Sequence, residues 1–249
     1  MNNNVVSIHE LSFNYPGQKK PCFSNLNLDI IEGERFGIFG PNGAGKTTLI
    51  NCIIGVLCFQ KGSIRIFNND IKKNKKEAKK IFGFVPQDFS FYHELSPIEN
   101  FNFFGTCYGI NKTELKNKIS ELLEVLNLTD VRHKPIKDFS GGMKRKINLA
   151  IGVLHNPKLL ILDEPTVGVD VHSRQTIINY LKQMNLNGTT LIYTSHQLDE
   201  AEELCNKIAL YDHGKILAID NLNNLLQRYQ ANNLEDLFVS LTGEKNKNL

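Results

Sequence analysis

Nine consecutive residues have the types and spacing that bind phosphate groups. They are Gly40, Pro41, Asn42, Gly43, Ala44, Gly45, Lys46, Thr47 and Thr48. The stretch matches the pattern G-x-x-x-x-G-K-[ST], in which glycines let the backbone curl so that successive N–H groups point at a polyphosphate. Lys46 can neutralise the β- and γ-phosphates, and Thr47 can offer its hydroxyl to Mg2+. The loop therefore predicts binding of a nucleoside triphosphate.

An acidic pair, Asp163 and Glu164, is the second candidate. It follows residues 159–162, an apolar run without alternation that is typical of a central parallel strand buried on both faces. In a protein with a phosphate loop, Asp163 would hold Mg2+, directly or through water, and Glu164 would polarise the attacking water. The alternative is an acidic helix cap, which Pro165 disfavours because we expect it to continue the chain in an extended path.

A glycine pair after a capping serine is the third candidate. Ser140 is suited to cap the helix that the apolar spacing after it predicts. Gly141 and Gly142 follow at once, although each glycine costs about 1 kcal/mol relative to alanine in a helix. Such a start suggests that something approaches the backbone closely, and a phosphate at the helix N-terminus is the obvious candidate.

Two single residues have weaker signals. Tyr15 lies before a Pro-Gly turn, where its ring can stack on a nucleotide base or pack on the sheet as an ordinary turn tyrosine. The sequence alone favours the packing role. His196 follows an apolar strand at residues 189–195, and ligands bind at that edge of a parallel sheet. A lone histidine is nevertheless more often structural.

Hydrophobic spacing indicates the elements that position these residues. An apolar run at 36–39 precedes the phosphate loop and helical spacing at 49–57 follows it, which is the strand-loop-helix context that disfavours a chance match. Strand formers at 5–13, with alternation at 26–30 and 64–66, predict a small antiparallel sheet beside it.

The middle and the end of the chain are mainly helical in this interpretation. A buried strand at 81–85 ends in Pro86 and Gln87, and the region 88–157 is expected to be helical. Ser96 with Glu99 forms a capping box, and Asn111 with Glu114 repeats the device. After His196 we expect a helix, a hairpin around residues 212–214 and two short helices, with residues 244–249 frayed.

Composition excludes several classes. Of the 249 residues, 41% are hydrophobic, as in a globular protein with a substantial core. The sequence has neither a membrane-spanning apolar run nor the features of a signal peptide, so we expect a cytoplasmic protein. Five scattered cysteines argue against a metal or disulfide framework. The net charge of +3 is too small over this length to imply a nucleic-acid partner by itself, and we expect none. The basic run 72–80 is more typical of a solvated helix face than of a phosphate or lipid site.

Taken together, these stretches resemble the ATP-binding subunit of ABC transporters over nearly the whole chain. Tyr15 matches that family's adenine-stacking aromatic, residues 40–48 its Walker A loop, Gln87 its Q-loop and Ser140 with its glycines its signature. Residues 159–164 match Walker B with its catalytic glutamate, 167–170 match the D-loop, and His196 matches the switch histidine.

The resemblance implies an α/β fold, a P-loop NTPase of the ABC type. Its parallel-sheet core would carry an N-terminal antiparallel β subdomain and an inserted α-helical subdomain. As boundaries within a single domain we expect a core at 1–87 and 158–219, a helical subdomain at 88–157 and a C-terminal extension at 220–249.

The resemblance also implies roles and partners. Glu164, His196 and Gln87 would act in hydrolysis, and Thr47, Gln87 and Asp163 would hold Mg2+. Two such chains, as a homodimer, would close head to tail so that Ser140, Gly141 and Gly142 touch the ATP of the partner. Separate integral membrane subunits would hold the chain at the inner face of the membrane and choose the cargo.

Details of the motifs favour one branch. Phe139 and Met143 flank the signature where leucine and glutamine are usual, and residues 234–238 read LEDLF, which looks like the branch of bacterial drug, antibiotic, sodium and polysaccharide exporters. Val171 directly follows the last residue of the D-loop, where that branch often has proline. An importer subunit remains an alternative. So does a soluble ATPase acting on ribosomes or DNA, although about 93 residues without sustained heptads separate Walker A from the signature. A non-hydrolysing scaffold is disfavoured by Glu164 and His196.

One further surface is expected to meet the membrane partner. Six aromatic residues fall within 16 positions after Gln87, and they are Phe89, Phe91, Tyr92, Phe101, Phe103 and Phe104. They can form an exposed apolar groove or an aromatic core, and the sequence does not decide between the two.

Overall fold

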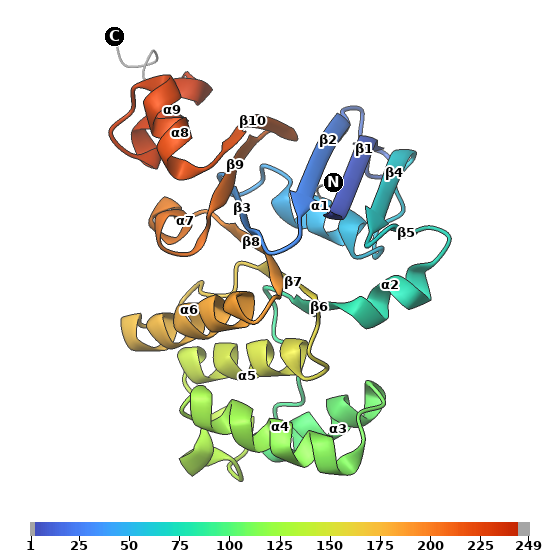
Figure 1. The fold of residues 1–249 in the computed structure, drawn as a ribbon, viewed down its shortest axis with the longest axis vertical. Coiled ribbons are helices and arrows are strands. Elements are labelled where there is room, and N and C mark those ends of the chain that lie inside the picture. Colours follow the sequence, from blue (N-terminus) through green and yellow to red (C-terminus); the bar gives the residue numbers. More distant parts are fainter. Residues whose placement is uncertain (1–2, 244–249) are drawn as a thin grey trace. The chain divides into compact units, whose positions relative to one another are not determined.

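A computed structural model describes residues 3–243 and places the chain in the α/β class (Figure 1). The chain forms two compact units, Met1–Lys80 with Thr190–Leu249, and Ile81–Thr189. We call them the first and the second unit. The expectation that residues 244–249 fray falls outside the described residues, and the subdomain boundaries given above remain a prediction.

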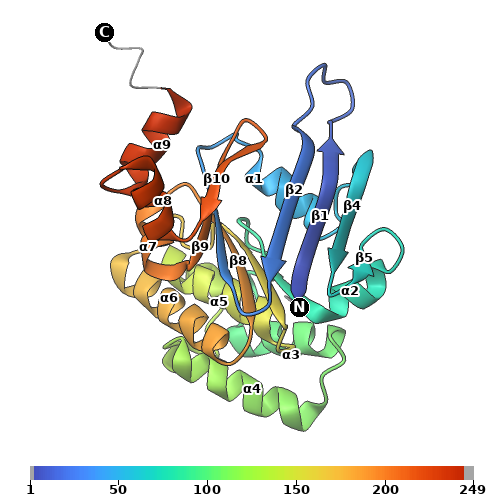
Figure 2. The ribbon, with the colours of Figure 1, turned by 45° about the horizontal axis from the view of Figure 1, so that its top comes forward.

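An antiparallel sheet opens the first unit. It contains β1 (Asn4–Phe13), β2 (Phe23–Ile31), β4 (Lys61–Ile66) and β5 (Asn69–Asp70) in the order β2-β1-β4-β5, and β2, β1 and β4 run side by side in Figure 2. Leu26, Leu28 and Ile30 are buried while Asn27 and Asp29 between them are exposed. The alternation therefore produced the predicted antiparallel sheet with one wet face.

The parallel strands of the first unit position the phosphate loop. Strand β3 (Arg35–Phe39) pairs in parallel with β8 (Thr190–Ser195) and with β9 (Lys207–Asp212), and β9 forms the predicted hairpin with β10 (Lys215–Asp220). Helix α1 (Lys46–Ile53) follows the loop. Helices α7 (Leu198–Leu204), α8 (Leu222–Tyr229) and α9 (Leu234–Thr242) complete the unit, with α8 next to β10 in Figure 2.

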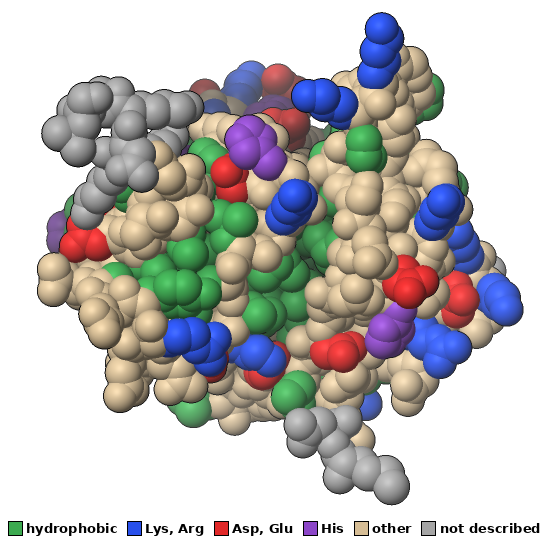
Figure 3. All heavy atoms as spheres, turned by 90° about the horizontal axis from the view of Figure 1, so that it is seen from above, with side chains coloured by type: hydrophobic (Ala, Val, Ile, Leu, Met, Phe, Trp, Pro, Cys, Tyr) green, Lys and Arg blue, Asp and Glu red, His purple; other side chains and the backbone are tan. Residues whose placement is uncertain are grey.

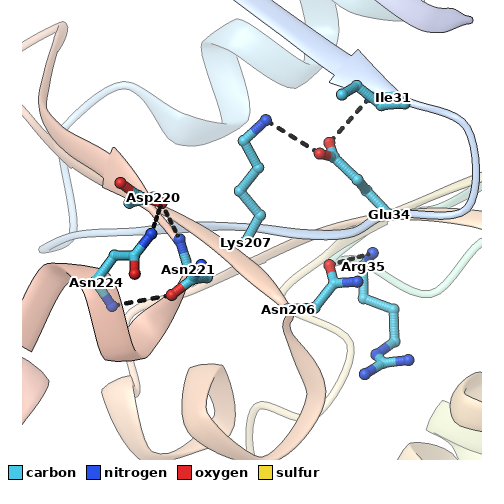
Figure 4. A network of polar contacts seen from close by, with 8 residues as sticks. All are labelled: Ile31, Glu34, Arg35, Asn206, Lys207, Asp220, Asn221 and Asn224. Carbon is cyan, nitrogen blue, oxygen red and sulfur yellow. Dashed lines mark hydrogen bonds and ion pairs between the residues drawn. The ribbon is translucent and has the colours of Figure 1, made fainter. Parts of the chain in front are cut away.

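Polar contacts fix the start of β3 (Figure 4). The ammonium of Lys207 lies 3.0 Å from Glu34 Oε1, and Glu34 Oε2 accepts a hydrogen bond of 2.9 Å from the Ile31 amide. The Arg35 amide donates to Asn206 Oδ1 at 2.9 Å. Because Lys207 and Glu34 are both partly buried, this ion pair is screened less than a surface pair. The contacts join the end of β2, the start of β3 and the start of β9.

A second cluster fixes the junction between β10 and α8 (Figure 4). Asp220 Oδ1 accepts hydrogen bonds from Asn224 Nδ2 and from the Asn221 amide, and Arg228 lies 2.7 Å from Asp220 Oδ2. These hydrogen bonds lower the pKa of Asp220. The bond from the Asn224 side chain contributes most, and the bond from the Asn221 amide comes next. Asn221 in turn caps α8 by accepting from the Asn224 amide.

The second unit combines a strand pair with helices. Strands β6 (Phe82–Val85) and β7 (Leu159–Asp163) are parallel, and all five residues of β7 are buried. Helix α5 (Gly141–Val153) packs against β6, α3 (Pro97–Cys107) and α6 (Val171–Leu186), while α4 (Lys112–Val125) contacts α3 (Figure 1). Two short 3-10 turns, Thr129–Val131 and Ile136–Asp138, lead into α5.

Predicted helix caps are confirmed in this unit. Ser96 Oγ accepts from the Glu99 amide, and Glu99 Oε2 accepts from the Ser96 amide at 2.8 Å, which completes the capping box. Asn111 caps α4 by accepting from the Glu114 amide at 2.9 Å. These bonds satisfy N–H groups that a helix start leaves without partners.

Three differences from the sequence prediction are local. Helix α2 (Lys75–Ile81) includes Ile81, so the strand begins one residue later than expected. Residues 88–96 are an irregular segment rather than part of a helical region. Helix α3 begins at Pro97 because proline, which has no N–H to donate, fits the first position of a helix and not its interior. Helix α6 was not foreseen, although Asp170 caps it by accepting from the Ser173 amide at 2.9 Å.

Charge and exposure on the surface are mixed. Figure 3 shows one face on which hydrophobic side chains gather in a hollow, while Lys and Arg are scattered among Asp and Glu. In the basic run, Lys80 pairs with Glu77 at 3.0 Å, and the Lys72 ammonium lies 3.9 Å from the centre of the Phe59 ring. Between residues 3 and 243, none of the helices has the length and the apolar character that a membrane span requires.

Candidate active site

The phosphate loop joins β3 to α1 as predicted. Gly45 caps α1 with a φ of 103°. This is a left-handed backbone conformation, which residues with a side chain rarely adopt. A Cβ on Gly40 would overlap the carbonyl oxygen of Tyr211 in β9, so a side chain has no room there. The bend of the loop and its contact with β9 thus both require glycine.

Lys46 lies inside this loop. Its ammonium donates to the carbonyl oxygens of Gly40 at 2.8 Å and of Pro41 at 3.2 Å, and the residue is only 5% exposed. Thr47, the next residue, is exposed. The positive charge is therefore held at the concave side of the loop, where a polyphosphate can replace the two carbonyl contacts.

Tyr15 is tied to the start of α1. Its hydroxyl lies 3.0 Å from Thr48 Oγ1, and its ring meets the Phe13 ring edge to face at 4.8 Å. These contacts match the ordinary packing role that the sequence favoured. The ring is partly exposed, and its stacking on adenine remains a prediction.

His196 reaches the same edge of the sheet as the phosphate loop. Strands β3 and β8 are parallel, with Phe39 opposite Ser195, so Gly40 and His196 are the residues that leave each strand. His196 is exposed. The carboxyl ends of adjacent parallel strands are where such folds bind ligands.

The acidic pair and Gln87 meet in the second unit. Val85 in β6 lies opposite Leu162 in β7, so the two strands end side by side. Gln87 Nε2 donates to Glu164 Oε2 at 3.4 Å. Glu164 is 5% exposed and Asp163 is 2% exposed. The pairing thus brings together two segments separated by 77 positions in the sequence.

The chain turns sharply after Glu164, which corrects the expectation of an extended path. Glu164 has a φ of 49°, and residues 165–168 form a turn in which the Val167 amide donates to the Glu164 carbonyl at 3.4 Å. Pro165 fits this turn because its ring sets a φ that turn positions also use. A left-handed glutamate costs free energy, and such strain is found where a side chain must be held in one place.

Arg145 links these segments, although it belongs to none of the motifs predicted from the sequence. This residue of α5 is 9% exposed and donates from Nη1 to the Gln87 carbonyl and from Nε to the Val167 carbonyl at 3.3 Å. Its guanidinium lies 4.8 Å from the centre of the Phe89 ring. Burial lowers the pKa of Arg145, and the charges of Asp88 and Glu164 oppose that shift. The sequence signal that could have indicated a buried role for Arg145 is a positively charged residue among the apolar positions of α5.

Ser140 caps α5 as predicted, and Gly142 has an additional structural role within the chain. Ser140 Oγ accepts from the Met143 amide at 3.3 Å. A Cβ on Gly142 would overlap Ser173 Oγ and lie 2.7 Å from Asp170 Oδ2 at the start of α6. Close packing against α6 therefore also requires glycine at this position, and the contact of Gly142 with a partner's phosphate remains a prediction. Gly141 is exposed and keeps the predicted contact open.

The structure thus assembles two groups of the predicted residues. Tyr15, the loop 40–48 and His196 belong to the first unit, and Gln87, Asp163, Glu164 and the signature glycines belong to the second. The donors assigned to Mg2+ are a hydroxyl, an amide oxygen and a carboxylate. This all-oxygen set suits Mg2+, which also binds phosphate oxygens and water.

Comparison with known proteins agrees with this arrangement. Residues 23–167 match the family model for ABC transporters. The linearmycin resistance ATP-binding protein LnrL of Bacillus subtilis is 41% identical over 222 residues, which span 89% of this chain and 71% of LnrL. The Nod factor export ATP-binding protein I of a Rhizobium species is 33% identical over 219 residues, 88% of this chain and 72% of the relative.

Solved structures show the same fold. The ATP-binding subunit of an ABC transporter superposes with a TM-score of 0.87 at 25% identity, over 96% of this chain and 99% of that one. A dimeric ATP-binding cassette, solved after hydrolysis with ADP and phosphate bound, has a TM-score of 0.78 at 25% identity, over 87% of this chain and 98% of that one. The chain belongs to the ABC transporter family, as an ATP-binding subunit with the P-loop ATPase fold.

Proposed function

We propose that this subunit powers an exporter by hydrolysing ATP at the cytoplasmic face of a membrane, in complex with separate integral membrane subunits. The relatives LnrL and Nod factor export protein I are named for antibiotic resistance and for export, which supports this direction. One observation carries the coupling: Gln87 contacts Glu164 with its side chain, and Phe89, two residues on, begins the aromatic segment.

In this proposal each residue of the two groups has one task. Tyr15 stacks on adenine, the loop 40–48 and Lys46 hold the phosphates, and Glu164 orients and polarises the attacking water. Mg2+, held through Thr47, Gln87 and Asp163, would neutralise charge that develops on the phosphate oxygens. His196, exposed at the edge of the sheet where the loop begins, acts in hydrolysis.

A second copy would complete the site in trans. Ser140 and Gly141 are exposed at the start of α5, so a partner's nucleotide can approach them. We propose a homodimer that closes on ATP and reopens after hydrolysis, and that passes this motion to the membrane subunits.

Asp163→Asn tests the magnesium assignment. Hydrolysis by the wild-type subunit should stop in EDTA, and Asp163→Asn should lower it about tenfold or more while raising the Mg2+ concentration needed for half activity. The exposed Asp130→Asn is the matched control. Phosphate release measured across a Mg2+ titration gives both numbers. An unchanged titration curve for Asp163→Asn would remove this residue from the metal site.

The aromatic segment is part core and part surface. Phe101 is fully buried and Phe91 nearly so, whereas Tyr92 is 51% and Phe103 44% exposed. The rings of Tyr92 and Phe103 meet edge to face at 5.0 Å, and those of Phe103 and Phe104 at 5.2 Å. We call Tyr92, Phe103 and Phe104 the aromatic surface. We propose that it receives an apolar cytoplasmic segment of the membrane subunit.

Hydrogen exchange on the isolated subunit and on the membrane complex tests this docking. Residues 88–108 should become more protected in the complex, and Phe103→Ser should weaken assembly because it removes exposed apolar area from the contact. Leu186→Ser, at an apolar residue that is 83% exposed in α6, is the control for a general loss of hydrophobic surface. Equal protection of 88–108 in both states would contradict the aromatic surface as the docking site.

The direction of transport has its own test. An adjacent reading frame for an integral membrane protein of about six spans would support the exporter, because such a subunit can bind cargo from the cytoplasm or the membrane. A neighbouring periplasmic-type binding protein would instead make the chain an importer subunit.

A further inference from the structure

A cysteine outside the known motifs lies against the phosphate loop. Cys22 precedes β2, and its sulfur would be 3.1 Å from a Cβ placed on Gly45, the cap of α1. Its amide donates to the Phe13 carbonyl at 2.9 Å. Its carbonyl is packed by Gly214, where any Cβ would overlap it. The backbone of Cys22 is therefore fixed, and its thiol faces the loop.

The loop is held from the same side. The Gly214 amide in the β9–β10 turn donates to the Ala44 carbonyl at 3.0 Å. The Cys22 sulfur thus lies beside the loop at Gly45, and the Cys22 carbonyl lies beside Gly214 in the turn that supports the loop. A group added to the Cys22 sulfur would press on the backbone that must present its N–H groups to a phosphate.

A buried polar group without a partner faces the same place. The hydroxyl of Tyr211 is fully buried, has no hydrogen-bond partner among residues 3–243, and would be 3.6 Å from the same Cβ position on Gly45. Burial raises the pKa of Tyr211, and the neighbouring Cys22 and Cys52 raise it further. Burying a hydroxyl without a hydrogen-bond partner costs free energy. The Tyr211 hydroxyl can therefore donate a hydrogen bond to a group that enters beside Cys22.

Neighbouring cysteines differ from Cys22 in accessibility. Cys52 lies in α1 with no exposed area, and burial, with Cys22 and Cys58 adding to it, raises its pKa to about 12, which keeps it an unreactive thiol. Cys58 is exposed beyond the end of α1, and Cys22 is partly exposed. Cys22 therefore combines access with contact to the loop.

We propose that Cys22 is a thiol-modification site, at which a mixed disulfide with a small disulfide compound blocks ATP binding. The Cys22 thiol gives its proton to water and the thiolate attacks one sulfur of the compound. A new S–S bond forms as the S–S bond of the compound breaks, and the other half leaves as a thiolate that takes up a proton from water. A second thiol reverses the step and restores the loop. The inference rests on ATP binding at the phosphate loop.

Methyl methanethiosulfonate is the probe, since it forms the same kind of mixed disulfide with methanesulfinate as the leaving group. It is used on the full chain carrying Cys58→Ser and Cys107→Ser, which removes the two exposed thiols. The reagent should attach a methylthio group to Cys22, identified by peptide mass. Affinity for a fluorescent ATP analogue should fall about tenfold or more, because closely packed residues beside the phosphate loop must shift to accept added atoms. Dithiothreitol should restore the affinity, and ATP bound beforehand should slow labelling of Cys22.

Further variants separate the thiol from the fold. With Cys22→Ser added, the affinity measured with the reagent should equal the affinity measured without it, and Cys22→Ala replaces this variant if serine lowers the melting temperature. A fully labelled Cys22 with unchanged ATP affinity would overturn the inference, as would a Cys22 that the reagent never labels. If the untreated protein binds no ATP, the proposed function fails and the inference fails with it.

Discussion

Glu164→Gln should bind ATP about as well as the wild type, hydrolyse it about a hundredfold more slowly or worse, and accumulate as a closed dimer. A general base acts in the transition state, whereas phosphate contacts also hold the ground state, so hydrolysis should depend on Glu164 more than binding does. Glutamine has the same shape, and its amide oxygen can keep the contact of 3.4 Å that Gln87 makes with Glu164.

Two measurements check this result. ATP binding is followed by equilibrium fluorescence, and the dimer by size-exclusion chromatography with and without ATP. Glu202→Gln, at an exposed glutamate of α7, controls for the loss of one negative charge. Wild-type turnover in Glu164→Gln would remove Glu164 from the catalytic role.

Mixing two inactive variants should restore activity if the site is shared between copies. Lys46→Ala removes the cation on the phosphates, and Ser140→Arg blocks the approach to the exposed start of α5. Each homodimer then carries the defect in both sites. In the mixed dimer one site carries both defects and the other carries neither, so we expect up to about half the wild-type rate per dimer.

The single variants complete this test. Ser140 also caps α5, so Ser140→Arg loses a cap worth about 1 kcal/mol in addition to gaining bulk. Ser140→Ala loses the same cap without the bulk and should retain more activity than Ser140→Arg. If Ser140→Arg alone hydrolyses ATP normally, at a rate linear in protein concentration, the signature does not complete the site and the dimeric mechanism fails.

The segments predicted correctly from the sequence depend on neighbours along the chain. The capping box at Ser96, the cap at Asn111, the turn at residues 212–214 and the phosphate loop all form from residues within about ten positions, and backbone geometry gives them nearly the same structure in any context. The alternation in β2 likewise needed no partner to be recognised.

The errors and omissions arise where the local pattern is weak, where it fits two conformations, or where distant segments meet. Helix α6 has a cap but a weakly patterned apolar face, so its signal was lost beside the D-loop. The sequence also showed no sign that Ser173 packs against Gly142. Pro165 was read as extending the chain, although its fixed φ suits a turn equally well once Glu164 adopts a left-handed backbone.

The sequence by itself determined the chemistry of this protein, because a phosphate loop, a Walker B carboxylate pair and a capped glycine signature are short and set by local backbone geometry. Tertiary structure decided which groups hold those residues in place. Arg145 between Gln87 and Val167, Tyr211 against Gly40, and Cys22 against Gly45 are contacts over 22 to 171 positions. Such contacts follow from the packing of whole elements, which no local pattern encodes.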